Sequence, residues 1–300
     1  MKKNVDRVIV SNNLVVVIGW CEGPGPRIAV NGDEVEYQVC HRLKRPDVAE
    51  FLNSDDEREY GFRVSAVTTI SGLDHSNISL IFPGGIIVEQ MPTNPEDRVH
   101  EVFDRFVKTV ADSAPGASMI ELGSRARSGN TYKHLFPTLS TYTGVDMNPG
   151  NNVDVVQDIH TLSRAITSQY DFAFSVSVFE HLLMPWVAAV ELNKVLVDGG
   201  LAYIQSHPTW PLHDEPWDFF RFSKHAWQGL FNSFTGFEIL DAAYGMEASI
   251  MPASMAGCSL KDIEMQRSFL LSGCLIKKIS EPQVDWQCDP SGFYSSSYSY

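Results

Sequence analysis

Three acidic side chains follow three successive apolar stretches in the middle of the sequence. Glu121 closes the run SMIE, Asp146 closes YTGVD, and Asp158 closes VDVVQD. An ionised carboxylate only accepts hydrogen bonds, so it suits a ligand that presents hydroxyl or amino groups. Asp146 lies 25 positions after Glu121, near the ~20-residue spacing at which an acid in a nucleotide site meets ribose hydroxyls. The acids therefore predict a nucleoside site in which Asp158 accepts from an exocyclic amine such as adenine N6.

A tight turn follows the first acid, in the run ELGSRARSGN. Gly123 at the strand exit lets the backbone approach a ligand closely, because no Cβ intervenes, and Gly129 marks the expected start of a helix. The dinucleotide fingerprint G-x-G-x-x-G is absent, since Arg125 and Arg127 replace glycines. NAD and FAD are therefore disfavoured, whereas a cofactor without a pyrophosphate tolerates these side chains.

A second group of reactive side chains lies in the run HPTWPLHDEPWDFFRFS, residues 207 to 223. It holds His207, His213, Asp218 and Arg221, and His181 follows an earlier strand. Imidazole titrates near neutral pH, so each histidine is a candidate general base. We favour His213 as the base, with Asp218 orienting it and Arg221 binding substrate or Asp218. In the opposite interpretation, Asp218 and Arg221 form a structural bridge and the histidines bond to the backbone.

The composition of this second group also bears on its ligand. Aromatic faces beside polar groups suit a sugar ring or a planar acceptor. A divalent ion is compatible with clustered His, Asp and Glu, but no ligand spacing requires one. We therefore expect no metal.

The elements that must position these residues alternate from residue 113 onward. The runs SMIELG, YTGVD, VDVVQD, DFAFSVSV and LAYIQS are typical of strands, and helical stretches lie between several of them. Residues 185 to 197 predict a helix closed by Asp198-Gly199-Gly200, and Ser223 predicts the N-cap of a helix carrying Trp227, Leu230 and Phe231. This alternation predicts an α/β fold with helices on both faces of a parallel sheet and ligands at the carboxyl ends of its strands.

Domain boundaries follow from changes along the chain in the pattern of apolar and turn-forming residues. Residues 1–90 contain short strands separated by turn formers, which predicts a small all-β sandwich. Residues 91–97 (MPTNPED) predict a linker, residues 98–280 the α/β domain, and the Ser- and Tyr-rich residues 281–300 a flexible tail. Residues 98–110 predict an amphipathic helix. Two strands near residues 237–241 and 269–279, around a short helix near 259–267, complete the sheet, the seventh strand being antiparallel.

Composition excludes several classes of function. Asp and Glu outnumber Lys and Arg by 37 to 23 and no basic run is present, so nucleic acid is not expected as a partner. The five cysteines are scattered without C-x-x-C spacing, which favours reduced thiols in the cytoplasm over disulfides or a zinc knuckle. No apolar run approaches ~18 residues, so we expect no membrane span.

Taken together, the runs ELGSRARSGN, YTGVD, VVQDIHTL, YDFAFSVSVFEHL and ELNKVLVDGGLAYI resemble class I S-adenosylmethionine-dependent methyltransferases, especially the type 11 group, over residues 98 to 279. The resemblance implies a Rossmann-like seven-stranded sheet with helices on both faces and S-adenosyl-L-methionine (SAM) as the cofactor. It implies that Glu121 and Gly123 line the methionine and ribose side, that Asp146 binds ribose, and that Asp158 and Ile159 bracket adenine. The candidate cofactor residues are Glu121, Gly123, Ser124, Arg125, Gly129, Asp146, Met147, Asp158, Ile159 and Ser175.

Two further features qualify this resemblance. The family commonly has E-x-G-x-G-x-G in the loop where this chain carries arginines. The amino-terminal residues Gly19-Trp20, Arg45-Pro-Asp47-Val and Gly61-Phe62 loosely resemble β modules that accompany glycan-modifying enzymes.

The favoured hypothesis is a SAM-dependent methyltransferase that methylates a hydroxyl of a saccharide or similar small metabolite, by in-line transfer with a histidine base. The alternative is a non-catalytic nucleotide-binding or interaction protein, although the polar and aromatic loop at 207–223 is unnecessary for cofactor storage alone. An NAD oxidoreductase requires a pyrophosphate to fit beside Arg125 and Arg127. Neither the acceptor nor the oligomeric state follows from the residues.

Overall fold

The computed structural model describes residues 1–54, 58–89, 91–127, 129, 131–252, 263 and 266–293. The chain forms two compact units, of which the first comprises Met1–Pro95 and Ala248–Arg267 and the second comprises Glu96–Glu247 and Ser268–Tyr300. The α/β region is therefore interrupted by a segment of the first unit, whereas the sequence analysis treated residues 98–280 as continuous. The helix expected near residues 259–267 lies largely outside the described residues.

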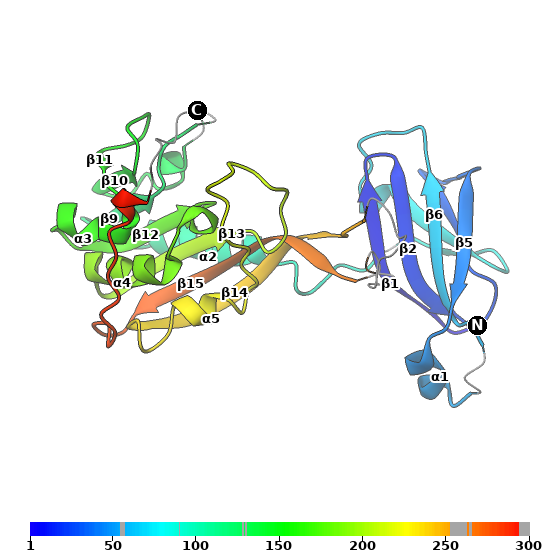
Figure 1. Cartoon of the computed structure of the whole chain (residues 1–300). Coiled ribbons are helices and arrows are strands. Elements are labelled where there is room, and N and C mark those ends of the chain that lie inside the picture. The colour runs from blue at the N-terminus through cyan, green and yellow to red at the C-terminus, as the bar shows by residue number, and fades with distance from the viewer. Residues whose placement is uncertain are drawn as a thin grey trace. The chain divides into compact units, whose positions relative to one another are not determined.

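The first unit is the predicted β-sandwich, built from two four-stranded sheets of order β1-β2-β6-β5 and β4-β3-β7-β8 (Figure 1). Alternating residues on facing strands fill its core, among them Val15 and Val17, Phe62 and Leu80. The elements of this unit are β1 (Lys3–Ser11), β2 (Leu14–Cys21), β3 (Arg27–Val30), β4 (Asp33–Glu34), β5 (Gln38–Leu43), α1 (Pro46–Leu52), β6 (Gly61–Val67), β7 (Ile78–Phe82) and β8 (Ile86–Val88).

The residues that carry the amino-terminal resemblance have packing roles here. A Cβ on Gly19 would lie 2.3 Å from the carbonyl oxygen of Asn4 and 2.7 Å from the Phe62 ring. Arg45 pairs with Asp6 at 2.6 Å and with Asp47 at 2.7 Å, beside the start of α1. These contacts explain why Gly19, Arg45 and Asp47 stand at their positions, and they require no ligand.

Arg7 joins the two stretches of sequence that make up the first unit. Its side chain is buried in β1, and its guanidinium donates to the carbonyl oxygens of Ala248 and, at 3.0 Å, Gln266. Arg267 donates to the carbonyl oxygen of Asp6 at 3.2 Å. A buried guanidinium requires such acceptors, so residues near both ends of the 248–267 segment are part of this unit.

The second unit contains the predicted seven-stranded sheet, with order β11-β10-β9-β12-β13-β15-β14. β9, β10, β11, β12 and β13 pair in parallel and β15 pairs antiparallel with β13, as expected for the last strand. The strands are β9 (Ser118–Leu122), β10 (Thr141–Asp146), β11 (Val155–Val156), β12 (Tyr170–Val176), β13 (Leu196–Ser206), β14 (Phe237–Ala248) and β15 (Ser268–Lys278). Helices α2 (Val99–Ala111), α3 (Leu162–Ala165), α4 (Pro185–Val195) and α5 (Trp227–Leu230) accompany them.

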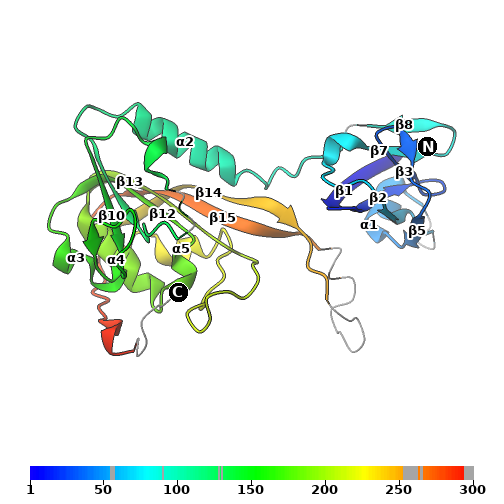
Figure 2. The ribbon, with the colours of Figure 1, turned by 90° about the horizontal axis from the view of Figure 1, so that it is seen from above.

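Helices cover both faces of this sheet (Figure 2). The stripe Val99, Val102, Phe106 and Val110 of α2 packs on one face, together with Met119 of β9. On the opposite face lie residues of α3, α4 and α5, together with Ile120 of β9. Because neighbouring residues of a strand point to opposite faces, Met119 and Ile120 serve different cores. The sheet is therefore buried on both faces, which leaves the strand ends as the place for polar chemistry.

Two predicted helix boundaries are wrong. Helix α4 ends at Val195 and β13 begins at once, so Asp198-Gly199-Gly200 lies within strand β13, where its pairing with β12 shifts register, and forms no C-cap. Leu196 pairs with Tyr170 of β12, and this pairing ends the helix early. Ser223 accepts from the backbone N–H of Ala226 at 3.2 Å and thus caps a turn that precedes the four-residue α5.

The ends of the second unit also differ from expectation. Asp97, assigned to the linker, accepts from the backbone N–H groups of Met246 and Glu247 at 2.9 Å and so belongs to the α/β unit. The predicted flexible tail is packed over its described part, since Gln283 donates to the carbonyl oxygen of Phe234 at 2.7 Å and Pro290 is buried. None of the described helices is long and apolar enough to cross a membrane.

Candidate active site

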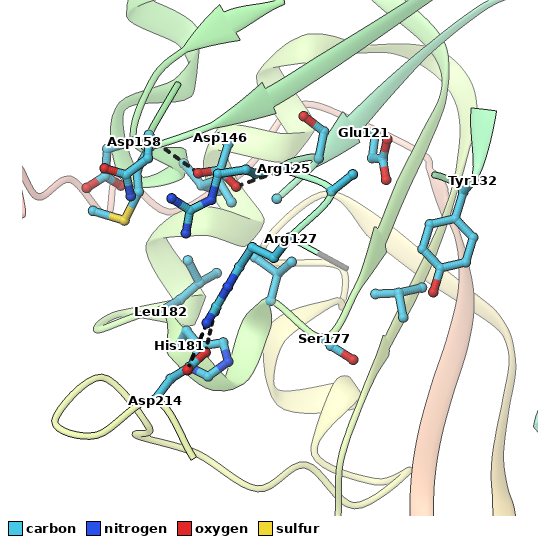
Figure 3. A pocket seen from close by; sticks show the side chains of 18 of the residues that line it. Glu121, Arg125, Arg127, Tyr132, Asp146, Asp158, Ser177, His181, Leu182 and Asp214 are labelled. Carbon is cyan, nitrogen blue, oxygen red and sulfur yellow. Dashed lines mark hydrogen bonds and ion pairs between the residues drawn. The ribbon is translucent and has the colours of Figure 1, made fainter. Parts of the chain in front are cut away.

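A cavity of about 480 Å³ lies at the carboxyl ends of β9, β10 and β12 (Figure 3). β9, β10 and β12 are parallel neighbours whose carboxyl ends lie at the same edge of the sheet. The acids that close β9 and β10, and the acid that follows β11, therefore reach one space. Its lining includes the three predicted acids, most of the predicted turn and two of the predicted histidines. The residues are Glu121, Gly123, Ser124, Arg125, Ala126, Arg127, Tyr132, Asp146, Met147, Asn148, Asp158, Ile159, His160, Val176, Ser177, Val178, His181, Leu182, His213 and Asp214.

Glu121 is the most buried of the three acids. Its Oε2 accepts from the Tyr142 hydroxyl at 2.7 Å and from Asn152 Nδ2 at 2.8 Å. Burial raises the pKa of this carboxyl, and the two hydrogen bonds oppose the rise. Both of these bonds use Oε2, so Oε1 is the oxygen left to meet a donor of a ligand within the described part of the site.

Asp146 ends β10, with one oxygen directed toward the turn after β9 and the other toward the residues that follow β10. Oδ1 accepts from the N–H of Asn148 at 2.9 Å, and Oδ2 accepts from the N–H of Arg125 at 3.4 Å. The second contact is long, and a carboxylate offers about four lone-pair positions. Asp146 therefore keeps acceptor capacity for a ligand with two hydroxyl groups.

Asp158 is held by its neighbour His160. Its Oδ1 lies 2.8 Å from the backbone nitrogen and 2.7 Å from Nδ1 of His160, while Nε2 of His160 accepts from the N–H of Met184 at 3.1 Å. The Nδ1–H tautomer satisfies both ends of the ring. His160 is buried, so it orients Asp158 and leaves Oδ2 for an amine donor.

The turn after β9 has a different basis from the one predicted. Gly123 has φ of +73°, and a Cβ there would lie 2.2 Å from Cγ2 of Val178, so the glycine makes room for a neighbouring side chain of the same chain. In the described part of this loop no α-helix begins at Gly129, and a short 3-10 turn, Lys133–Leu135, follows instead. Pro137 limits any helix here, because proline disfavours the helical conformation in the preceding residue. The prediction of a helix start at Gly129 is wrong.

The two arginines of the turn point to different partners. The side chain of Arg125 lies against Gly150, because a Cβ on Gly150 would be 2.7 Å from Cγ of Arg125. Arg127 reaches Asp214 of the 207–223 loop, with NH1 2.6 Å from Oδ2 and NH2 3.2 Å from Oδ1 (Figure 3). The hydrogen bonds from Arg127 hold the pKa of Asp214 below its usual value. This contact, which the sequence did not predict, connects two loops that line the cavity.

Of the three histidines that the sequence offers as candidate bases, two line the cavity and one does not. The rings of His181 and His213 are 4.8 Å apart and both line the cavity. Nδ1 of His181 lies 2.8 Å from the carbonyl oxygen of Trp217, and Nδ1 of His213 lies 3.1 Å from that of Pro211. Because a carbonyl oxygen can only accept, each Nδ1 carries the proton in these contacts and each Nε2 keeps a lone pair.

His207 contacts a buried carboxylate behind the cavity. Its Nδ1 lies 2.8 Å from Oε1 of Glu180, whose Oε2 accepts from Ser206 at 2.6 Å. Burial raises the pKa of Glu180, but the contacts with His207 and Ser206 outweigh it, so the pKa lies below its usual value. His207 is buried and stacks on Trp210 at 4.3 Å, and it is absent from the cavity lining. These positions favour an orienting role for His207 over the role of a base.

Asp218 and Arg221 form the bridge of the alternative interpretation. NH1 and NH2 of Arg221 lie 2.5 Å and 2.7 Å from the two oxygens of Asp218, and Arg221 also donates to the carbonyl oxygens of Trp210 and Pro211. Asp218 accepts from the N–H of His213 at 3.1 Å, and its Oδ2 is 3.3 Å from Nδ1 of His213. The pair therefore fixes the loop that carries His213 and stands outside the cavity lining.

Replacing Asp218 with alanine is expected to lower the free energy of unfolding by about 2–4 kcal/mol, because Arg221 would lose a buried, two-point partner. The hydrogen bonds from Arg221 hold the pKa of Asp218 below its usual value. The stabilisation is thus full above the unfolded pKa of about 3.9 and is lost as pH falls through the folded value. Urea denaturation at pH 7 and pH 3 measures both effects.

A matched control for this variant is Arg164→Ala. Arg164 pairs with Asp289 at 2.5 Å, but both side chains are largely exposed. Its loss should destabilise the protein much less than the loss of Asp218, because solvent screens an exposed pair. Equal effects of the two substitutions would contradict a structural role for the Asp218–Arg221 bridge.

Most predicted cofactor residues meet at the cavity, and two do not. Gly129 is exposed, and Ser175 is buried in β12, where its hydroxyl donates to the carbonyl oxygen of Leu122 at 3.3 Å. Residues that line the cavity but were not assigned a role in the sequence include Tyr132, Asn148, Val178, Leu182 and Asp214. Asn148, Leu182 and Asp214 each adjoin a predicted site residue, so proximity in sequence was a usable signal for these three.

Comparisons with known proteins add distant likenesses. No family model matches the sequence, and no curated protein matches it. Among solved structures, the chain is similar to N-methyltransferase NodS from Bradyrhizobium japonicum in complex with S-adenosyl-L-homocysteine, at 14% identity over 62% of this chain and 89% of that one, with a TM-score of 0.39. It is also similar to YcgJ from Bacillus subtilis (16% identity, 60% and 99% covered, TM-score 0.40) and to the [4+2]-cyclase SpnF (16%, 59% and 81%, 0.40). Likenesses this distant leave the activity to be argued from the site itself.

Proposed function

We propose that this protein is a SAM-dependent methyltransferase that methylates a hydroxyl group of a saccharide or similar small metabolite. The observation that carries the proposal is the convergence of Glu121, Asp146 and Asp158 on one cavity at the strand ends. A nucleoside with a charged amino acid arm presents ribose hydroxyls, an exocyclic amine and an ammonium group, which are the donors that three carboxylates accept. One acid at a strand end is commonplace, but three that meet in order along the sheet constitute a site.

Unpaired polar atoms in the cavity lining support the fit of SAM. Ser124 Oγ and Asn148 Nδ2 are buried and have no partner among the described residues. Buried polar atoms are normally hydrogen-bonded, so an unpaired donor and hydroxyl beside a cavity fit a polar ligand. Asp146 would hold the ribose, Asp158 and Ile159 the adenine, and Glu121 the amino group. The chemistry that SAM supplies is an activated methyl group on a sulfonium.

The chain's own residues then have little to do beyond alignment and proton removal. The acceptor hydroxyl must lie in line with the methyl group, and its proton must leave. We assign this proton to Nε2 of His213, with His181 next to it as the second candidate. Asp218 would orient His213, and Arg221 would hold Asp218. Trp210, partly exposed in the same loop, offers an apolar face of the kind that binds sugar rings.

The test is a transfer assay with a labelled methyl group on SAM and a panel of saccharides and small hydroxylated compounds. His213→Gln is expected to lower kcat by about 10²–10⁴ at pH 7 while binding of S-adenosylhomocysteine stays within twofold, because only proton removal is lost. His100→Gln, on the exposed side of α2, is the matched control. Unchanged kcat in His213→Gln would remove this residue from the mechanism.

A non-catalytic nucleotide-binding protein is the alternative. It shares the acids of the cavity and differs in the loop, where His213, Asp218 and Arg221 would serve packing only. Binding of S-adenosylhomocysteine without transfer to any acceptor in the panel would favour it. An NAD oxidoreductase has less support, since the described residues after the turn form only the short 3-10 turn Lys133–Leu135 and offer no α-helix N-terminus to receive a pyrophosphate.

A further inference from the structure

Beside the cavity, three potential metal ligands converge. One carboxylate oxygen of Glu180 and one ring nitrogen each of His181 and His213 all lie within 4.8 Å of one another. Nε2 of His181 is 4.0 Å from Oε1 of Glu180. Ligand bonds of about 2.0–2.2 Å require donors roughly 3–3.5 Å apart, so small side-chain movements would complete a site. The Asp218–Arg221 bridge fixes the backbone of the loop that carries His213, so the movement required is a rotation of the histidine side chains.

The surroundings of these ligands prepare them to bind a cation. Carbonyl oxygens of Trp217 and Pro211 hold the Nδ1 protons of His181 and His213, which leaves Nε2 free as the ligand atom. Metal-bound histidines are usually oriented in this way by a second acceptor. Ser206 and His207 contact the two oxygens of Glu180, and a carboxylate oxygen has a second lone pair available for an ion.

We propose that Glu180, His181 and His213 bind a divalent transition-metal ion such as Zn²⁺ or Co²⁺ at the wall of the cavity. Imidazole and carboxylate ligands favour these ions over Mg²⁺ and Ca²⁺, which prefer oxygen alone. Three protein ligands leave at least one position open toward the cavity. A metal was not expected from the sequence because His213 stands 32 positions after His181, outside any ligand spacing.

The inference rests on the proposed function for the role of the ion. An acceptor hydroxyl coordinated at the open position would be oriented toward the methyl donor and would lose its proton to solvent more readily. With the ion bound, both Nε2 lone pairs are used, so His213 acts as a ligand, the ion acidifies the coordinated hydroxyl and solvent takes the proton. A saccharide with neighbouring hydroxyl groups could fill two coordination positions.

The experiment uses the full chain after metal has been removed by dialysis against a chelator. This protein is titrated with Co²⁺, followed by absorption spectroscopy, and separately with Zn²⁺, followed by calorimetry. One ion per chain is expected. His181→Ala and His213→Ala should each weaken metal binding at least about tenfold, because loss of a residue that only orients a metal ligand already weakens binding by about this factor. The control His100→Ala should bind as the unaltered protein does. Circular dichroism checks folding, and His213→Ala carries the test if His181→Ala fails to fold.

Two arms separate this inference from the proposed function. Binding of S-adenosylhomocysteine is measured on the same metal-free and metal-loaded samples. Nucleoside binding without metal uptake, or metal uptake equal in all variants, overturns the metal site and leaves the methyltransferase intact. Metal uptake that depends on His181 and His213, without any nucleoside binding, supports the site and refutes the proposed function.

Discussion

Asp146→Ala is expected to weaken binding of S-adenosylhomocysteine by about 100-fold or more. Asp146 would accept from both ribose hydroxyls, and a hydrogen bond to a charged acceptor contributes about 1.5–3 kcal/mol. Two such bonds amount to at least about 3 kcal/mol, and each 1.4 kcal/mol is a factor of ten in affinity. Isothermal titration calorimetry of both proteins at pH 7 measures the difference.

Two controls determine what a loss of binding means. Asp146 also accepts from the N–H groups of Asn148 and Arg125, so its removal could disturb the turn. Asp146→Asn keeps the shape and one acceptor and should have an intermediate affinity. Asp104→Ala, on the exposed side of α2, should bind as tightly as the unaltered chain. Full affinity in Asp146→Ala would place the ribose elsewhere and refute the orientation of the cofactor given above.

Gly123→Ala is expected to lower the free energy of unfolding by about 2–5 kcal/mol. The left-handed backbone at Gly123 costs a residue with a Cβ about 1–2 kcal/mol. The new methyl group would also overlap Val178, whose Cγ2 lies 2.2 Å from the Cβ position, and overpacking adds about 1–3 kcal/mol. Because Val178 lines the cavity, affinity for S-adenosylhomocysteine should fall as well. Urea denaturation and calorimetry measure the two effects.

Gly129→Ala separates the two causes. Gly129 has a similar φ of +81°, but a Cβ there would meet none of the described residues within 4 Å, so only the backbone cost of about 1–2 kcal/mol should remain. The double variant Gly123→Ala with Val178→Ala should regain the overpacking part. If Gly123→Ala is no worse than Gly129→Ala, the close approach of Val178 has no energetic consequence.

The sequence predicted the α/β fold well because its signals are local and periodic. Val99, Val102 and Phe106 repeat at helical spacing, and the structure places all of them against the sheet. Glu121 and Asp146 were found because parallel strands end at one edge, which topology guarantees once the strands are assigned. Candidate residues at strand ends were therefore largely placed correctly.

Features that depend on long-range pairing escaped prediction. The early end of α4 follows from pairing of Leu196 with Tyr170, 26 positions away, and no local signal reports it. Arg127 was read as a bulky loop residue because its partner, Asp214, stands 87 positions further on. The convergence of Glu180 and His181 with His213 depends on the same long loop. Side chains that meet only through tertiary structure have no fixed spacing in the chain.

The dependence of the first unit on residues 248–267 bears on how the chain can be divided and in what order it matures. A ribosome releases residues 1–95 long before Ala248, so buried Arg7 lacks its two carbonyl acceptors until most of the α/β unit has been synthesised. A fragment that ends before Ala248 therefore removes two carbonyl acceptors from a buried guanidinium of the sandwich. A fragment that begins at Glu96 carries a twenty-residue insertion without the strands it belongs to. Neither unit can be excised as one uninterrupted stretch of gene.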